Sequence, residues 1–398
     1  SIAWSHELLT QPEQILLRRL SVFTGGCGLD DAEAVVADDA LAQEAVLDLL
    51  DRLVAQSLVH LDDEPFIPRY LLLETVRHYA ARRLVEAGEA DALTERHARR
   101  YHREVVRRGP RAEVDFDIES FAWLVAELDN FAAAVAWFGD RGDVAERVDL
   151  ADHLALIWGL ADPPAGERVV SRLLDEVTTD DHRLRTLLAR AQVRSWAGDM
   201  LESAIDAIAA SEVAERLEDE WRANRSKLWL SQVLPWVDIE AGNALAEECI
   251  AESHRLGDTL AEVLASISYA GVTQGLRGDL IGGGELVEGI RPLVEAFANP
   301  IVSAWWHAQR AVGYAFRSRA DLALPHADEA DRLLSDLSRA MGARTERLQR
   351  ASVPGSIVSF ARAYATLLRA DSTPYLDELP RIAAECVRAG FLLAPCLL

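Results

Sequence analysis

The stretch RYLLLETVRHYAARRLVEAGE, from Arg69 to Glu89, decides how the first part of this chain folds. It is preceded by a run from Glu44 to Ser57 whose apolar residues recur at helical spacing. Two short segments of strand character lie between this run and a second helix that opens at Thr75. They cover Leu58 to Leu61 and Tyr70 to Leu73. A helix, two short strands and a second helix in this order predict a winged helix.

Five segments in this part of the chain resemble one regulator family. They are SVFTGGCGLDDAEAVV (Ser21 to Val36), VLDLLDRLVAQSLV (Val46 to Val59), YLLLETVRHYAARRLVEAGE (Tyr70 to Glu89), Arg96-His97, and WLVAELDNFAAAVAW (Trp123 to Trp137). Together they resemble the winged-helix segment of the large actinobacterial STAND regulators, the AfsR-like and LuxR-type ATP-binding transcriptional regulators. The likeness covers roughly the first third of the chain, and its strength is that the segments occur in the family's order.

The resemblance implies a regulatory and sensor region of a multidomain transcriptional regulator. In that family the winged helix packs on an ATPase domain and holds it in an ADP-bound resting state, so ATP or ADP is expected in an upstream domain and no cofactor in this chain. Helical repeats then receive a signal from a protein, a peptide or a small anionic effector, and an output domain elsewhere delivers the response. The alternative is a stand-alone adaptor of tetratricopeptide-like repeats without a transcriptional role.

Composition and charge set limits on these functions. A chain of 398 residues is too long for one ordinary core, and its content predicts a mostly helical protein of at least two domains. The formal net charge of -24 repels phosphate backbones. The first helix of the predicted winged helix carries Glu44, Asp48 and Asp51 against Arg52, whereas a recognition helix presents basic or amide side chains. We therefore expect no direct nucleic-acid binding.

The spacing of the cysteines and the hydropathy pattern indicate in which cellular compartment the protein acts. Four cysteines lie far apart without a CxxC pair, which argues against disulfides and zinc: Cys27, Cys249, Cys386 and Cys396. A charged and apolar leader is missing, as is an apolar run long enough to span a bilayer. The sequence therefore predicts a cytoplasmic protein without membrane contact. Because it starts without methionine and stops inside an apolar segment, we expect it to be part of a longer polypeptide.

An aspartate followed by an aliphatic residue recurs along the second part of the chain. It occurs at Asp199-Met200, Asp238-Ile239, Asp279-Leu280 and Asp321-Leu322, which are 39, 41 and 42 residues apart. This period suits helical hairpins somewhat longer than tetratricopeptide units, with each aspartate capping the second helix. The alternative is a generic bundle of antiparallel helices.

Small residues are expected where the two helices of a hairpin cross. Alignment with a tetratricopeptide unit places this crossing at Ala191, Leu230, Gly271 and Gly313 on the first helices, and at Ser203, Gly242, Gly283 and Pro325 on the second helices. The predicted architecture is therefore mainly α, with a winged helix and connecting helix over residues 1–110 and an α-solenoid of tetratricopeptide-like hairpins over residues 111–398. The boundary is set by Gly109-Pro110.

Sequence motifs of catalysis are missing. A phosphate-binding loop needs GxxxxGK[ST], but Lys227 is the only lysine and lies inside a helical pattern. The run Gly282 to Gly284 has no lysine or hydroxyl residue after it. Neither an HExxH pair nor a GxSxG elbow is present. We expect neither an enzyme nor a metal site.

The concave face of a hairpin stack is its usual interaction surface. The same alignment places eight candidate partner-binding residues there: Arg185, Gln192, Asn224, Lys227, His307, Arg310, Tyr314 and Arg317. Basic side chains in so acidic a chain would suit an acidic peptide, a neighbouring acidic domain or an anionic metabolite. A register error of one or two residues would scatter them. For the adjacent Trp305 and Trp306, we expect both rings in the core.

Overall fold

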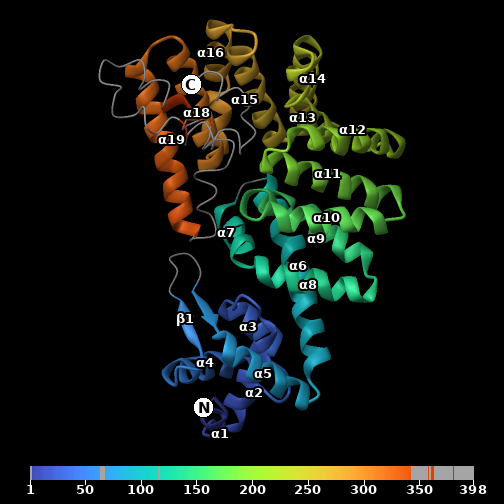
Figure 1. The fold of residues 1–398 in the computed structure, drawn as a ribbon, viewed down its shortest axis with the longest axis vertical. Coiled ribbons are helices and arrows are strands. Elements are labelled where there is room, and N and C mark those ends of the chain that lie inside the picture. Colours follow the sequence, from blue (N-terminus) through green and yellow to red (C-terminus); the bar gives the residue numbers. More distant parts are fainter. Residues whose placement is uncertain are drawn as a thin grey trace. The chain divides into compact units, whose positions relative to one another are not determined.

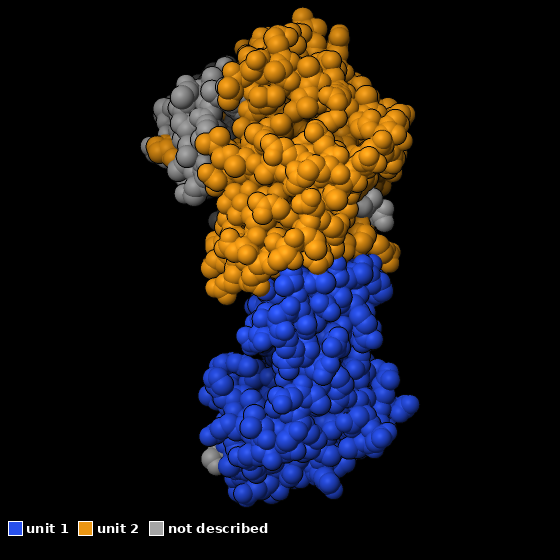
Figure 2. All heavy atoms as spheres, turned by 90° about the vertical axis from the view of Figure 1, so that its right-hand side faces the viewer, with its two compact units in different colours: residues 1–109, 118–150 blue, residues 110–117, 151–398 orange. Residues whose placement is uncertain are grey.

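A computed structural model describes residues 2–62, 68–114 and 117–341, with positions 357, 360–362 and 380. In these residues the chain is helical apart from one two-stranded sheet (Figure 1). It divides into two compact units, residues 1–109 with 118–150 and residues 110–117 with 151–398, coloured separately in Figure 2. The predicted fold class, a winged helix followed by an α-solenoid, is confirmed.

The first unit begins with the winged helix. Its elements are α1 (Ile2–Glu7), α2 (Gln11–Arg19), the short 3-10 helix η1 (Leu20–Val22), α3 (Leu29–Val36), η2 (Gln43–Ala45), α4 (Val46–Ala55), β1 (His60–Asp62), β2 (Arg69–Leu71) and α5 (Glu74–Glu86). The strands are antiparallel, with Leu61 opposite Tyr70. Each predicted element is present, and its ends differ from the prediction by one or two residues.

Helix α4 shows why the periodic apolar run becomes helical. Its side chains at helical spacing, Val46, Leu49, Leu50 and Leu53, are all buried, whereas the acidic residues between them face solvent. Burial of one continuous face stabilises a helix of this length more than its intrinsic propensity does.

Three further helices follow the winged helix: α6 (Ala90–Val114), α7 (Ile118–Ala126) and α8 (Leu128–Arg141). The predicted boundary at residue 110 is wrong in one respect, because residues 118–150 belong to the first unit. The cause is aromatic contact between these elements. The ring of Tyr101 on α6 stacks on Trp123 at 5.9 Å and meets Phe131 edge-on at 5.7 Å. Helix α6 also continues through Pro110, where a break was expected.

A buried polar network joins the wing to these helices. The carboxylate of Glu127, which is fully buried, forms an ion pair with Arg69 of β2. It also accepts hydrogen bonds from the hydroxyl of Tyr101 (2.9 Å) and the amide of Asn130 (2.6 Å). Arg69 in turn donates to the carbonyls of Gly25 and Gly26, each at 2.9 Å. Every oxygen and guanidinium group named here is thus paired inside the unit.

The glycine turn before α3 is part of this network. Gly26 has a φ of +73°, and an added Cβ would lie 2.7 Å from the carbonyl oxygen of Tyr70. Only glycine accommodates both constraints. The turn places Cys27 beside β2, where its backbone pairs with that of Tyr70 in both directions (3.1 and 2.9 Å). The side chain of Asn130 holds the same turn through Gly26 O (2.9 Å) and Thr24 N (3.0 Å).

The remaining helices form hairpins. They are α9 (Val144–Ala161), α10 (Pro163–Glu176), α11 (Asp180–Ala197), α12 (Met200–Leu217), α13 (Glu220–Ser231), η3 (Leu234–Trp236), α14 (Ile239–Leu256), α15 (Thr259–Gly275), α16 (Leu280–Gly289), α17 (Arg291–Phe297), α18 (Pro300–Phe316) and α19 (Ala320–Met341). Helices α11 with α12, α13 with α14, α15 with α16, and α18 with α19 pack as pairs, and the first helices α11, α13, α15 and α18 also touch in sequence (Figure 1). Residues 342–398 of the predicted array lie almost wholly outside the described residues.

The recurring aspartates cap the second helices, though not in every hairpin. The side chain of Asp238 accepts from Ala241 N (3.0 Å), and that of Asp279 accepts from Gly282 N (2.8 Å). Asp199 precedes α12 without such a bond. Asp321 lies inside α19 and pairs with Arg319 instead. The period is therefore real, and the capping role holds at two of its four positions.

The predicted crossing sites prove partly correct. Ser203 on α12 donates to the carbonyl of Ala191 on α11 (2.8 Å), and an added Cβ on Gly283 would lie 2.9 Å from Gln274 N. In contrast, Gly271 and Gly313 do not lie between the helices of one hairpin. A Cβ on Gly271 would meet Gln309, and one on Gly313 would meet Gln274. These two glycines thus admit glutamines between the neighbouring first helices α15 and α18.

Replacing Glu127 by alanine should destabilise the first unit strongly. The change leaves the guanidinium of Arg69 buried without its carboxylate, which typically costs about 3–5 kcal/mol of unfolding free energy. The check is urea denaturation of the two proteins. The matched control is Glu74→Ala, because Glu74 forms an exposed ion pair with Arg77 and should be almost silent. Equal losses for the two variants would contradict a structural role for the network.

At Gly283, alanine should weaken the repeat array. The new methyl group would press on the backbone of Gln274, and overpacking of this kind costs about 1–3 kcal/mol. Gly289 at the exposed end of the same helix has open space around an added Cβ, so Gly289→Ala should be neutral or slightly stabilising. Thermal unfolding followed by circular dichroism compares them. A silent Gly283→Ala would show that α15 and α16 are not held at this crossing.

Candidate ligand and partner site on the repeat array

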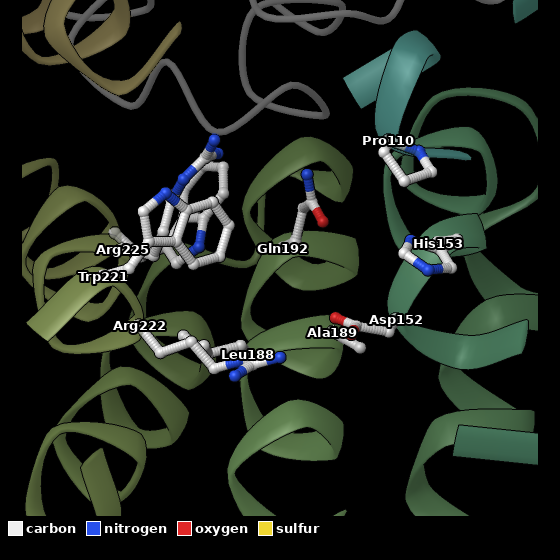
Figure 3. Close-up of a pocket in the computed structure, with 10 residues that line it drawn as sticks. Pro110, Asp152, His153, Leu188, Ala189, Gln192, Trp221, Arg222 and Arg225 are labelled. Atoms are coloured by element: carbon white, nitrogen blue, oxygen red, sulfur yellow. The ribbon is translucent and has the colours of Figure 1, made fainter. Parts of the chain in front are cut away.

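A pocket of about 240 Å³ lies on the repeat array. Its walls come from three successive first helices, α9, α11 and α13, and from one residue of α6 that belongs to the same unit (Figure 3). The lining residues are Pro110, Asp152, His153, Leu188, Ala189, Gln192, Trp221, Arg222, Arg225 and Trp229.

Gln192 lies at the centre of this lining. Its side chain points from α11 into the space between Trp221 on one side and His153 on the other (Figure 3). The residue is only 6% exposed, yet its amide makes no hydrogen bond to any described residue. Most buried amides are satisfied, so an amide left open toward a pocket is a position where a bound group can supply the missing partner.

One wall is aromatic and rigid. Trp221, Arg225 and Trp229 follow one another at intervals of four residues along α13. The guanidinium of Arg225 lies 4.7 Å from the centre of the Trp221 ring. Asp258 at the start of α15 fixes this guanidinium with two buried hydrogen bonds of 2.6 and 2.9 Å. The wall is therefore a preformed flat surface of indole and guanidinium planes.

The charged side chains of the lining are balanced from outside the pocket. Asp152 pairs with Arg185 at 2.7 Å, Arg222 pairs with Asp219 at 2.7 Å, and Arg225 pairs with Asp258. The pocket therefore presents polar groups without a net demand for a counter-ion.

The structure distributes the predicted site residues unevenly. Gln192 lines the pocket, and Arg185 lies beside it through its bond to Asp152. Asn224 and Lys227 face α14 instead: the amide of Asn224 donates to Ser253 (2.8 Å), and Lys227 pairs with Glu248. For these two residues the prediction is wrong.

The register of α13 explains the error. The side of this helix that faces the pocket carries Trp221, Arg225 and Trp229, not the predicted Asn224 and Lys227. One residue turns a side chain by about 100° around the helix axis, so a small shift in alignment selects another face. Sequence reasoning missed the correct side, although two tryptophans and an arginine at four-residue spacing are visible in the sequence.

The last four predicted residues form a separate cluster on α18. His307 shares a hydrogen bond with His326 of α19 (2.8 Å between the Nδ1 atoms), and Tyr314 stacks on His326 at 5.7 Å. Burial, together with the neighbouring His307, lowers the pKa of His326 to about 4. Arg310 pairs with Glu288 of α16 at 3.2 Å. These side chains pack against second helices, so their predicted place on the concave face is wrong.

A small depression lies beside this cluster. Arg310, Tyr314 and Arg317 line it together with Gln274, Gly284 and Gly313. Its volume of about 10 Å³ admits no more than one water molecule. Within the described residues it offers far less space than the pocket between α9, α11 and α13.

The tryptophan pair lies in the core, as expected. Trp305 and Trp306 are 5% and 7% exposed, and the indole of Trp306 donates to the carbonyl of Val287 (2.6 Å). The ring of Trp305 meets that of Trp196 on α11 edge-on at 6.1 Å. Side chains of α18 and α11 therefore meet although they are more than 100 residues apart in the sequence.

Other kinds of site find little support in the described part of the chain. A group of three or more histidines, cysteines or carboxylates that could hold a metal ion does not occur there. Burial raises the pKa of the Cys27 thiol well above its usual range and that of Cys249 to about 11, so both thiols are protonated at neutral pH. Among the described helices, none alone has the length and apolar content to cross a membrane; one bent pair, α7 with α8, meets this criterion only jointly.

Comparison with known proteins places the first unit in context. Residues 9–85 match the family of the winged helix-turn-helix domain. Over 225 residues, 54% of this chain, the sequence is 38% identical to a protein of Mycobacterium tuberculosis named as a predicted HTH-type transcriptional regulator and to one of the same description from Mycobacterium bovis. The chain spans about a quarter of the length of these curated relatives.

Two further similarities are more limited. An uncharacterized protein of Mycobacterium tuberculosis is 40% identical over 112 residues, which are 27% of this chain and 28% of that protein. The solved structure of a STAND protein with a tetratricopeptide repeat sensor, from Pyrococcus horikoshii, aligns with a TM-score of 0.37 and 13% sequence identity. The alignment covers 96% of this chain and 66% of that protein's chain. The chain is thus similar to transcriptional regulators of the winged helix-turn-helix type.

Proposed function

We propose that this chain is the regulatory and sensor region of a STAND-type transcriptional regulator of the LuxR and AfsR-like kind. In this proposal the winged helix packs on an upstream ATPase domain that binds ATP or ADP, and the repeat array receives the signal. The chain itself is not an enzyme and holds no cofactor. The protein acts in the cytoplasm, and its partners are the ATPase domain and a protein, peptide or small effector.

The exposed face of α4 carries this proposal. In a winged helix that reads DNA, this helix would present basic and amide side chains to the major groove. Here Asp48 and Asp51 of α4 and Glu44 of the preceding η2 are exposed beside a single Arg52. An acidic face repels phosphate and suits contact with a basic protein surface. It favours a winged helix that docks on protein.

The buried network supports the same role. Arg69 at the start of β2 is held by Glu127 and by two carbonyls of the glycine turn. The wing is therefore a rigid part of a unit that extends to residue 150. A rigid unit can transmit a change from the repeats to a domain docked on the winged helix, because interfaces between packed elements have discrete arrangements.

The coding sequence upstream of Ser1 in the source genome tests the proposal. A phosphate-binding loop of the form GxxxxGK[ST] in that sequence is expected. A second arm deletes residues 151–341 from the encoded protein and compares transcript levels with and without the signal. Loss of the response supports the sensor role. Upstream sequence without such a loop would instead favour the stand-alone adaptor.

DNA binding should be weak for the purified chain. The net charge of -24 and the acidic face of α4 oppose contact with phosphates at physiological salt. Gel-shift titration against a random duplex measures this, with the triple variant Glu44→Gln, Asp48→Asn and Asp51→Asn as the comparison. If the unaltered chain forms a submicromolar complex that survives competitor DNA, the winged helix binds DNA directly and the prediction is wrong.

Calorimetry should detect no tight ATP binding by the chain. Its single lysine, Lys227, pairs with Glu248 and is the only candidate for a phosphate-binding lysine. In the glycine run of α16, Gly282 to Gly284, Gly284 packs against the guanidinium of Arg317, and no lysine follows the run. Micromolar binding of ATP by the chain would overturn this part of the proposal.

A further inference from the structure

We propose that the pocket between α9, α11 and α13 binds a small, neutral, planar molecule that carries a carboxamide or a similar donor and acceptor pair. The inference deepens the proposed sensor function by naming the chemical class of its signal, and it rests on that function.

The size of the pocket sets the first limit. A cavity of about 150 Å³ accommodates one benzene ring, and drug-sized sites begin near 300 Å³. The 240 Å³ found here lies between these values. It suits one ring with a substituent, or two fused rings, and is too small for a folded peptide segment.

The lining decides the shape. Trp221 and Trp229 present indole surfaces from α13, and the guanidinium of Arg225 lies over the Trp221 ring, 4.7 Å from its centre. Flat aromatic and guanidinium surfaces favour stacking with a planar partner. Trp221 is 37% exposed, so one edge of this wall is reachable from solvent.

The charge balance decides that the ligand is neutral. Asp152, Arg222 and Arg225 each have an opposite charge within 3 Å, supplied by Arg185, Asp219 and Asp258. A bound ion would have to break one of these pairs or remain buried without a counter-ion, which is costly. This is why the pocket does not suit the anionic metabolite that the basic residues of the sequence suggest.

The amide of Gln192 indicates which polar group the ligand carries. The residue is 6% exposed, and its amide offers one donor group and one acceptor toward the pocket. A carboxamide on the ligand satisfies both at once, whereas a purely apolar ring satisfies neither. Loss of such a paired contact is expected to weaken binding by about 10-fold, a typical worth of a neutral hydrogen bond.

The experiment uses three molecules of one shape and different charge: benzamide, benzoate and benzamidine. The chain is labelled with 5-fluorotryptophan, and fluorine NMR follows the Trp221 and Trp229 signals, which Trp221→Phe and Trp229→Phe identify. Benzamide should shift both signals saturably, and the two charged molecules should bind at least about 10-fold more weakly, because the charge is buried unpaired.

Two substitutions separate a binding role from a structural one. Gln192→Leu should weaken benzamide about 10-fold, and Gln192→Glu should reverse the preference so that benzamidine binds best, since a carboxylate pairs with an amidinium. The matched control is Gln56→Leu, an exposed glutamine of the first unit, which should change nothing. Thermal unfolding confirms that each variant is folded.

Three outcomes would overturn the proposal. They are the absence of any saturable shift with benzamide, equal binding by Gln192→Leu, and a preference of the unaltered chain for benzoate.

The benzamide experiment can fail or succeed independently of the deletion experiment that tests the regulatory role. If benzamide fails while deletion of residues 151–341 still abolishes the transcriptional response, the ligand class is wrong and the sensor function stands. If benzamide binds as expected but the deletion leaves transcription unchanged, the pocket stands and the regulatory role falls.

Discussion

The ion pair between Arg69 and Glu127 is the constraint on which the first unit depends. Both side chains are almost fully buried, so neither charge can be solvated, and each is stable only while the other is present. The pair joins residues 58 positions apart. It explains why the family-like segments occur together: the glycine turn, the wing, the Tyr101 helix and the Asn130 helix all contribute to one set of hydrogen bonds.

This network bears on the docking role that we propose for the winged helix. A winged helix that reads DNA presents basic or amide side chains from its recognition helix to the major groove. In this protein the helix face is acidic, and the wing strand is anchored from inside the unit at Arg69. The same buried charges link the wing to the helices that extend the first unit to residue 150, in keeping with the docking role that we propose.

The repeat array is held together differently. There, polar side chains of one helix pack against small residues of the neighbouring helix. Gly271 admits Gln309 and Gly313 admits Gln274, so α15 and α18 approach closely along their first-helix faces. The side chains of α11 and α13 instead line the pocket that has Gln192 at its centre.

The sequence by itself determined the local features of this protein. The order of helix, strands and helix predicts the winged helix, and the recurring aspartates predict the hairpin period. Of the predicted groove residues, Gln192 lines the pocket, and its role in binding stays a prediction. It could not locate Asn224, Lys227 or the α18 residues, because one position turns a side chain by about 100° and the period does not say which face is inward. The Arg69 and Glu127 pair was equally out of reach, since charged residues are expected outside. Only the tertiary structure decided these contacts, because they depend on helices that are distant in sequence and adjacent in space.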